Sequence, residues 1–102
     1  MITLKVCSSS IDQIKGIAQF LLEQKLAIDI NINSINRLNL VNNTLEESSF
    51  FELNGKTKAL LFQNIDDLIK SKFKPAPEIY SSPIVHMDWE QTKLLAKEII
   101  NI

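Results

Sequence analysis

The sequence predicts an α+β domain in which helices cover one antiparallel β-sheet. Segments with an apolar residue at every second position are typical of strands, and they alternate with segments whose apolar residues have helical spacing. Two of the strand-like segments follow each other directly. The final strand-like segment of the chain carries prolines, which suit an edge strand. The predicted order is therefore β-α-β-β-α-β with a C-terminal helix, the order of a ferredoxin-like sandwich.

The first strand and the first helix are predicted from local patterns. Apolar residues alternate with more polar ones from Ile2 to Cys7, as expected for a strand with one buried face. Ser10 and Gln13 have the spacing of a capping box, in which each side chain binds a backbone amide near the other residue. Isoleucines and leucines at helical spacing follow, so the helix is expected to run to about Lys25.

Residues 27–55 predict a long β-hairpin. Strand-like alternation covers residues 27–41, which is well beyond the ~5–6 residues of a typical strand. A β-bulge near Ser34–Asn36 would account for a break in the alternation there. Asn42 and Asn43 predict a tight turn, because asparagine tolerates the left-handed backbone conformation that such turns need.

The second half of the chain predicts helix, strand and helix. Thr57 is expected to cap the second helix, which ends before Pro75 and Pro77. The edge strand is predicted from Glu78 to Val85, and Asp88 is expected to cap the last helix. The apolar residues expected to face the core are Leu61, Ile65, Leu68, Ile69 and Phe73 in the second helix, and Trp89, Leu95, Ala96, Ile99 and Ile102 in the last.

The predicted strands have one favoured arrangement. Right-handed crossovers place the first and third strands in the centre, the fourth beside the first, and the second outside the third. The hairpin then projects beyond the sheet, where a two-stranded ribbon is unstable alone and leaves its edges unpaired. We expect the hairpin to pair with another subunit.

Composition and charge narrow the class of protein. The chain has 102 residues, of which 45% are apolar, so we expect residues 1–102 to form one globular domain. The 11 basic and 12 acidic residues are mixed along the chain, which argues against a nucleic-acid-binding surface. No apolar run approaches the ~20 residues of a membrane span, and the first residues lack signal-peptide features, so a cytoplasmic location is expected. The single cysteine excludes an internal disulfide.

Several short motifs occur in an order that resembles the CutA-type divalent-cation tolerance family. They are LLEQKLA at Leu21–Ala27, INI at Ile30–Ile32, LEE at Leu45–Glu47, PEI at Pro77–Ile79 and SPIV at Ser82–Val85. The resemblance implies a ferredoxin-like subunit that forms a homotrimer, in which the long hairpins complete sheets between subunits. It also implies a role in tolerance of divalent metals such as copper.

Cys7 and His86 are the candidate metal ligands. A Cys7 thiolate would bind a soft ion such as Cu(I), although a free cysteine is often only a small buried side chain. A neutral His86 imidazole would bind Cu or Zn, although a lone histidine is more often structural, here as an exposed or helix-adjacent residue that hydrogen-bonds Asp88. Cys7 ends the first strand and His86 follows the fourth, which is its antiparallel neighbour. The end of one strand need not face the end of the other, and this argues against a site that uses both residues. Glu46 and Glu47 are more typical of a solvated strand end than of an ion site.

We expect a binding protein rather than an enzyme. The only glycines are Gly16 and Gly55, so there is no phosphate-binding loop, and neither a Cys-x-x-Cys nor a His-Glu-x-x-His motif occurs. The leading hypothesis is a homotrimer that binds a metal ion or a small ligand at clefts between subunits. The alternative is a PII-like trimeric signalling or scaffold module without metal. An RNA-binding domain has the same element order, but the adjacent Phe50 and Phe51 would face opposite sides of a strand.

Overall fold

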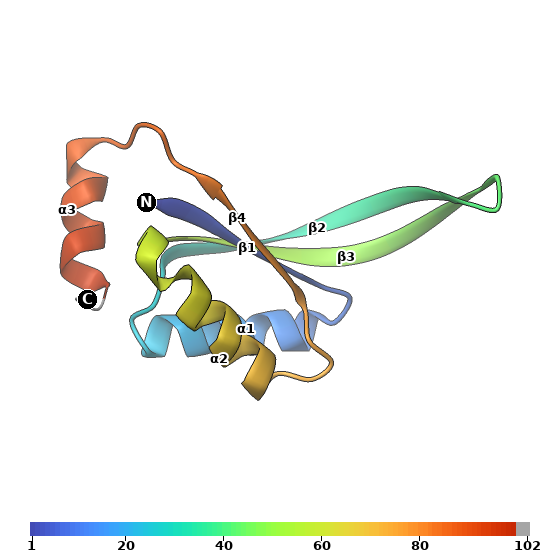
Figure 1. The fold of residues 1–102 in the computed structure, drawn as a ribbon, viewed down its shortest axis with the longest axis horizontal. Coiled ribbons are helices and arrows are strands. Elements are labelled where there is room, and N and C mark those ends of the chain that lie inside the picture. Colours follow the sequence, from blue (N-terminus) through green and yellow to red (C-terminus); the bar gives the residue numbers. More distant parts are fainter. Residues whose placement is uncertain (100–102) are drawn as a thin grey trace.

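The computed structural model describes residues 1–99 and contains every predicted strand and helix (Figure 1). The prediction for Ile102 lies outside the described residues. The elements, in chain order, are β1 (Ile2–Ser8), α1 (Ile11–Glu23), β2 (Ile28–Val41), β3 (Thr44–Thr57), a 3-10 turn (Ala59–Leu61), α2 (Phe62–Lys72), β4 (Glu78–Pro83) and α3 (Trp89–Glu98).

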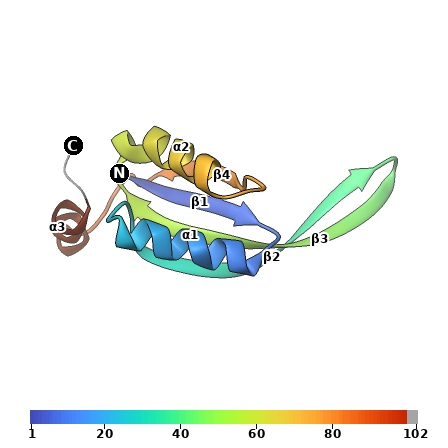
Figure 2. The same cartoon turned by 90° about the horizontal axis from the view of Figure 1, so that it is seen from below.

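The four strands form one antiparallel sheet in the order β2-β3-β1-β4, which confirms the predicted arrangement and the ferredoxin-like fold. Helices α1 and α2 lie side by side on one face of the sheet (Figure 2). Helix α3 lies at the end of the sheet near the N-terminus, opposite the end from which the β2–β3 hairpin projects (Figures 1 and 2). No helix among residues 1–99 is long and apolar enough to cross a membrane.

The core fills the layer between the sheet and the two helices. Side chains from one face of β1 and β3 meet the inner faces of α1 and α2, and the C-terminal segment adds one residue of α3 and the residue that follows it. Burial of this apolar surface is the main stabilising contribution to the fold. The most deeply buried members are Leu4, Val6, Ile14, Ile17, Leu21, Leu53, Leu61, Ile65 and Ile69, joined by Leu95 from α3 and by Ile99, which follows that helix.

The hairpin has the predicted length and turn, but its irregularity is elsewhere. Asn42 and Asn43 both have left-handed backbone, with φ of 52° and 64°, and connect strands paired in regular register. The predicted bulge near Ser34–Asn36 is wrong, because the register between β2 and β3 shifts between Ile28 and Asn31. Asp29 has φ of 52° and therefore accommodates the irregularity where β2 enters the sheet.

Beyond the core the hairpin continues as a two-stranded ribbon, which we define as residues 35–50. Strand β1 pairs with β3 only from Ser8 opposite Phe51 to Ile2 opposite Thr57, so residues 35–50 have no third strand beside them. The ribbon accounts for the elongated shape of the molecule, which measures 48 × 30 × 19 Å (Figure 1).

Two predictions about α2 are wrong. Thr57 does not cap the helix: it ends β3, is fully buried, and its hydroxyl donates a hydrogen bond of 2.6 Å to the carbonyl of Leu26. The helix begins only after the 3-10 turn, without a side-chain cap. Leu68 is 43% exposed, because the buried stripe follows Leu61, Ile65 and Ile69 at intervals of four.

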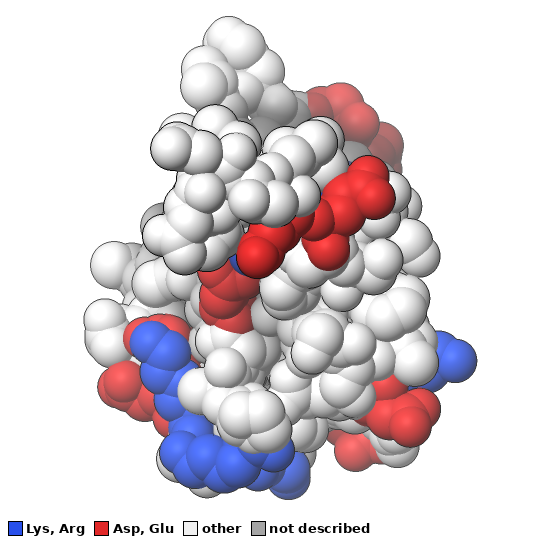
Figure 3. Space-filling view, turned by 90° about the vertical axis from the view of Figure 1, so that its right-hand side faces the viewer, with Lys and Arg blue, Asp and Glu red and all other residues white. Residues whose placement is uncertain are grey.

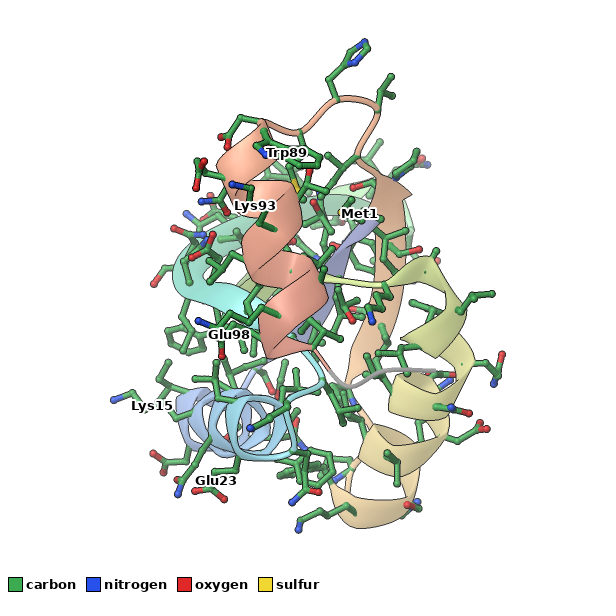
Figure 4. The ribbon with its side chains drawn as sticks, turned by 90° about the vertical axis from the view of Figure 1, so that its left-hand side faces the viewer. Met1, Lys15, Glu23, Trp89, Lys93 and Glu98 are labelled. Atoms are coloured by element: carbon green, nitrogen blue, oxygen red, sulfur yellow. The ribbon has the colours of Figure 1, made fainter. Side chains whose placement is uncertain are left out.

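The predictions for α3 are confirmed in part. The Asp88 side chain accepts a bond of 2.9 Å from the Gln91 amide, and Leu95 and Ile99 are buried. Trp89 is instead 69% exposed, beside Lys93, whose ammonium lies 5.6 Å from the indole ring centroid (Figure 4). Ala96 is also exposed. Both were wrongly assigned to the core, because Leu95 is the buried residue of this short helix and Ile99, which follows the helix, is the next buried residue.

The connections at the two ends of β4 also differ from expectation. The strand ends at Pro83 rather than at Val85, which is 82% exposed.

The predicted capping box of α1 forms only in half. Ser10 caps the helix by accepting from the Gln13 backbone amide at 3.2 Å. The Gln13 side chain donates instead to the carbonyl of Pro75, at 2.7 Å, and thereby ties α1 to the segment before β4.

Candidate functional site

A group of interacting side chains lies around Cys7 on the face of the sheet opposite α1 and α2. Val6 points into the core, so its neighbour Cys7 points to the other face. Cys7 is paired with Glu52 on β3 and with Glu78 on β4, and paired residues share a face. Tyr80, two residues along β4, joins the same face, and these side chains cover the thiol so that Cys7 is only 1% exposed.

The carboxylate of Glu52 is the centre of this group. Its Oε2 accepts a hydrogen bond from the Tyr80 hydroxyl at 2.9 Å and from the Cys7 thiol at 3.5 Å. Its Oε1 accepts from the Asn54 amide at 3.1 Å. The Cys7 sulfur and the Tyr80 hydroxyl are 3.4 Å apart. Three strands therefore contribute side chains to one hydrogen-bonded cluster, which we call the Cys7 cluster (Cys7, Glu52, Asn54 and Tyr80).

The environment sets the protonation states of the cluster. Burial is the largest cause that raises the pKa of the Cys7 thiol, and the Glu52 carboxylate raises it further. Burial also acts to raise the pKa of Glu52, but hydrogen bonds from Asn54, Tyr80 and Cys7 outweigh it and lower that pKa overall. The hydrogen bond with Cys7 and then burial raise the pKa of the Tyr80 phenol. At neutral pH the cluster is therefore one carboxylate with a protonated thiol and phenol.

Arg37 lies beside this cluster and connects it to the ribbon. Its guanidinium forms an ion pair with Glu78, the first residue of β4, and this hydrogen bond raises the pKa of Arg37. The guanidinium carbon is also 4.4 Å from the centroid of the Phe50 ring, a cation–π distance. Arg37 therefore contacts both the opposite strand of the ribbon and the body of the domain.

The structure places the two predicted metal ligands, Cys7 and His86, far apart within one chain. Cys7 pairs with Glu78 near one end of β1, whereas His86 follows Pro83, which pairs with Ile2 at the other end. The five steps along the strand from Ile2 to Cys7 span roughly 16 Å at about 3.3 Å each. His86 is exposed. Among residues 1–99 no group of three or more His, Cys, Asp or Glu side chains is arranged to hold a metal ion.

Sequence reasoning did not find Glu52, Tyr80 or Arg37 as members of the site. Glu52 pairs directly with Cys7, and Tyr80 lies two residues along β4 from Glu78, the other partner of Cys7. Arg37 reaches Glu78 by a side-chain contact from the opposite edge strand. No motif along the chain indicates these contacts. Glu46 and Glu47, by contrast, lie near the outer end of the ribbon, opposite Asn39 and Leu38, and are exposed.

The side of the molecule at the ribbon end is largely uncharged. Figure 3 shows broad uncharged surface there, with a few groups of acidic side chains and with basic side chains beside some of them. The ribbon contributes exposed apolar residues, with Leu38, Leu40 and Leu45 at 58%, 73% and 65% exposure. Leu40 is paired with Leu45, and Leu38 is two residues from Leu40, so all three share one face of the ribbon.

The sheet order, the two helices on one face and the projecting ribbon define a ferredoxin-like domain with an extended hairpin. Solved structures of CutA1 proteins, among them the divalent cation tolerance protein of Thermus thermophilus, are similar to this chain over nearly its whole length. The rice (Oryza sativa) protein matches with a TM-score of 0.85 and 19% identity, over 99% of this chain and 94% of its own. The Thermus thermophilus protein matches with a TM-score of 0.82 and 22% identity, over 97% of this chain and 99% of its own.

A third similar structure is the CutA protein of Archaeoglobus fulgidus, described as a periplasmic divalent cation tolerance protein. It is 25% identical and has a TM-score of 0.80, with 96% of this chain and 98% of that chain covered. No family model matches the sequence, and no curated protein matches it either. The structural likeness confirms the resemblance to CutA-type proteins that the short motifs indicate.

Proposed function

We propose that this chain is a divalent-cation tolerance protein of the CutA type that acts as a cytoplasmic homotrimer. The observation that carries the proposal is likeness over the full length: CutA1 structures cover 96–99% of this chain, and it covers 94–99% of theirs, including the ribbon. Proteins of one fold can differ in function, so the proposal also has to rest on the surfaces of this chain.

The ribbon supports self-association. Its outer edges carry backbone amides and carbonyls without a neighbouring strand, and such edges pair readily with another chain. One face of the ribbon exposes Leu38, Leu40 and Leu45. A second and a third copy of the chain would pair with the edges and cover the leucines, and closed symmetry would leave no ribbon uncovered.

We further propose that the trimer binds a soft or borderline metal ion, Cu or Zn, or a small ligand between its subunits. Cys7 and His86 are the proposed metal ligands. Cys7 lies near one end of β1, and His86 follows the part of β4 that pairs with the other end of β1. A site that includes both therefore needs residues from two copies. The Glu52 carboxylate, whose Oε2 is 3.5 Å from the Cys7 sulfur, is the nearest additional oxygen ligand. Metal binding would release the thiol proton, so affinity should increase with pH.

Two measurements test this function. Light scattering of reduced protein should give about three times the subunit mass of 11.6 kDa, and the mass should persist on dilution. Calorimetric titration with Cu(I) and Zn²⁺ should show binding that Cys7→Ser abolishes and His86→Ala weakens, whereas Lys97→Ala on the exposed part of α3 has no effect. A monomer would refute the assembly, and equal affinity in the Cys7→Ser variant would refute the metal site.

The alternative is a PII-like trimeric signalling or scaffold module that binds no metal. It is favoured by one observation, namely that residues 1–99 contain no group of three side chains arranged to hold a metal ion within one chain. A thermal-shift screen of the trimer separates the two functions. Stabilisation by nucleotides, without any response to Cu or Zn, would favour the signalling module.

A further inference from the structure

The ribbon is joined to the body of the domain by an ion pair between distant parts of the chain. Arg37 on β2 donates through Nη1 to the Glu78 carboxylate, which lies 41 residues later at the start of β4. The two residues belong to opposite edge strands of the sheet, so their contact crosses the open face between β2 and β4. Paired strands twist, and the twist of a two-stranded ribbon is larger than that of a full sheet, which is compatible with a contact between the two edges.

The Arg37 side chain is held on two sides. The Phe50 ring, which belongs to the other strand of the ribbon, lies 4.4 Å from the guanidinium carbon. The Arg37 side chain is 29% exposed and that of Glu78 is 56% exposed, so the pair is partly shielded from water. Planar guanidinium suits this arrangement because it stacks on an aromatic ring while it hydrogen-bonds a carboxylate.

An isolated two-stranded ribbon twists and bends easily, since no third strand or core restrains it. A contact between the ribbon and β4 restricts the direction in which the ribbon leaves the sheet. Direction matters for assembly, because the exposed leucines and the free edges must meet a second copy at a fixed angle. A ribbon with a preset direction loses less conformational entropy on binding.

We propose that Arg37 is a positioning residue whose contact with Glu78 sets the direction of the ribbon, so that its apolar face (Leu38, Leu40 and Leu45) is presented to a second copy of this chain. The proposal rests on the self-association put forward above. Its first part, the direction of the ribbon, concerns a single chain and is measurable whether or not the protein assembles.

The direction of the ribbon is measured by pulsed electron spin resonance. Nitroxide labels are placed on the exposed positions Lys15, in α1, and Glu46, on the ribbon, as K15C and E46C in a Cys7→Ala background. Labelled chains are diluted with unlabelled ones, so that only distances within one chain are recorded. The distance distribution should be narrow with Arg37 present and broad in Arg37→Gln. The exchanged pair Arg37→Glu with Glu78→Arg should narrow it again.

Assembly is measured on the same variants without labels. Arg37→Gln should weaken the association constant at least tenfold, and the exchanged pair should recover most of that loss. Lys93→Gln breaks an exposed ion pair with Glu90 on α3 and should change neither the distance distribution nor the association constant. Arg37→Lys keeps the charge without the planar stacking group, so its association constant should lie between those of the parent and Arg37→Gln. This variant replaces Arg37→Gln in the test if Arg37→Gln folds poorly.

An unchanged distance distribution in Arg37→Gln overturns the proposal, and so does a broadened distribution with an unchanged association constant. If the parent protein is a monomer at every concentration, the proposed function fails. In that case the distance distribution alone decides whether Arg37 directs the ribbon.

Discussion

The hydroxyl of Tyr80 on β4 lies 3.4 Å from the thiol of Cys7 on β1, and both side chains donate hydrogen bonds to one carboxylate oxygen of Glu52 on β3. Three strands are thus linked by one oxygen atom on the face of the sheet that the helices leave open. The arrangement keeps the thiol protonated and covered, so a metal ion or an alkylating reagent reaches it only if this cluster opens.

Removal of the Tyr80 hydroxyl should weaken the sheet modestly. The Tyr80→Phe variant keeps the ring but loses the 2.9 Å bond to Glu52, and a typical net hydrogen bond contributes roughly 0.5–1.5 kcal/mol. Urea unfolding should show a loss in that range. Ser82→Ala, two residues away on the same face of β4, is the matched control and should lose less. Equal losses in the two variants would mean that the bond from the Tyr80 hydroxyl to Glu52 adds no measurable stability.

The stability that Glu52 supplies should depend on pH. The folded-state pKa of Glu52 is lowered, so the carboxylate stabilises the fold above the ordinary glutamate pKa of about 4.3, and this contribution is lost as the pH falls through the folded-state value. The difference in unfolding free energy between the parent and Glu52→Gln should be constant near pH 7 and should shrink below about pH 4. A difference that persists at pH 2 would assign the effect to packing instead.

Cys7 should react slowly with iodoacetamide, and Glu52 should control the rate. Burial raises the pKa of the thiol, and the neighbouring carboxylate raises it further, so little thiolate forms at pH 7. Glu52→Gln removes the negative charge and should increase the alkylation rate severalfold, measured by mass spectrometry. Glu46→Gln changes a carboxylate far out on the ribbon and should leave the rate unchanged. An equal increase in both variants would exclude a local electrostatic cause.

Polar substitutions on the ribbon should affect assembly and spare the fold. Leu40 is 73% exposed, so Leu40→Ser should leave the urea midpoint of the isolated subunit nearly unchanged and lower the association constant of the trimer. Leu60 is 81% exposed and lies in the 3-10 turn before α2, so Leu60→Ser serves as the control. Trimers that persist equally well in both variants would show that the leucine face is not part of the interface.

Substitutions in the core should have the opposite effect. Leu53 on β3 is fully buried, and a buried Leu→Ala change costs about 2–5 kcal/mol through lost burial and the cavity that remains. Leu53→Ala should therefore destabilise the subunit strongly in urea unfolding. Leu68→Ala, at a position 43% exposed, should cost less than half as much. A similar loss in both would contradict the placement of the α2 inner face.

The fold was predictable from the sequence because its determinants are local. Alternation, helical spacing and the Asn42-Asn43 pair each act within a few residues, and crossover handedness then restricts the strand order. Reliance on local patterns also explains why Thr57 was wrongly predicted to cap α2. Its sequence neighbours resemble a helix start, but its hydroxyl is needed by the carbonyl of Leu26, 31 residues earlier.

The candidate site was only partly predictable. Cys7 and His86 stand out as residue types, whereas Glu52 and Tyr80 become partners of Cys7 only through the register of three strands. A shift of one residue would turn either side chain to the opposite face. No local pattern shows which register forms, so the Cys7 cluster and the Arg37–Glu78 pair emerge only from the assembled sheet.

The ribbon extends well past the outermost buried side chain of β3, Leu53, and it therefore contributes almost nothing to the core. Two properties of the protein are separated along the chain as a result. Substitutions in residues 35–50 are expected to alter self-association with little effect on folding, whereas substitutions of buried residues in the helices and in β1 are expected to alter folding. The ribbon is for that reason the segment in which we expect substitutions to change partner preference without loss of the domain.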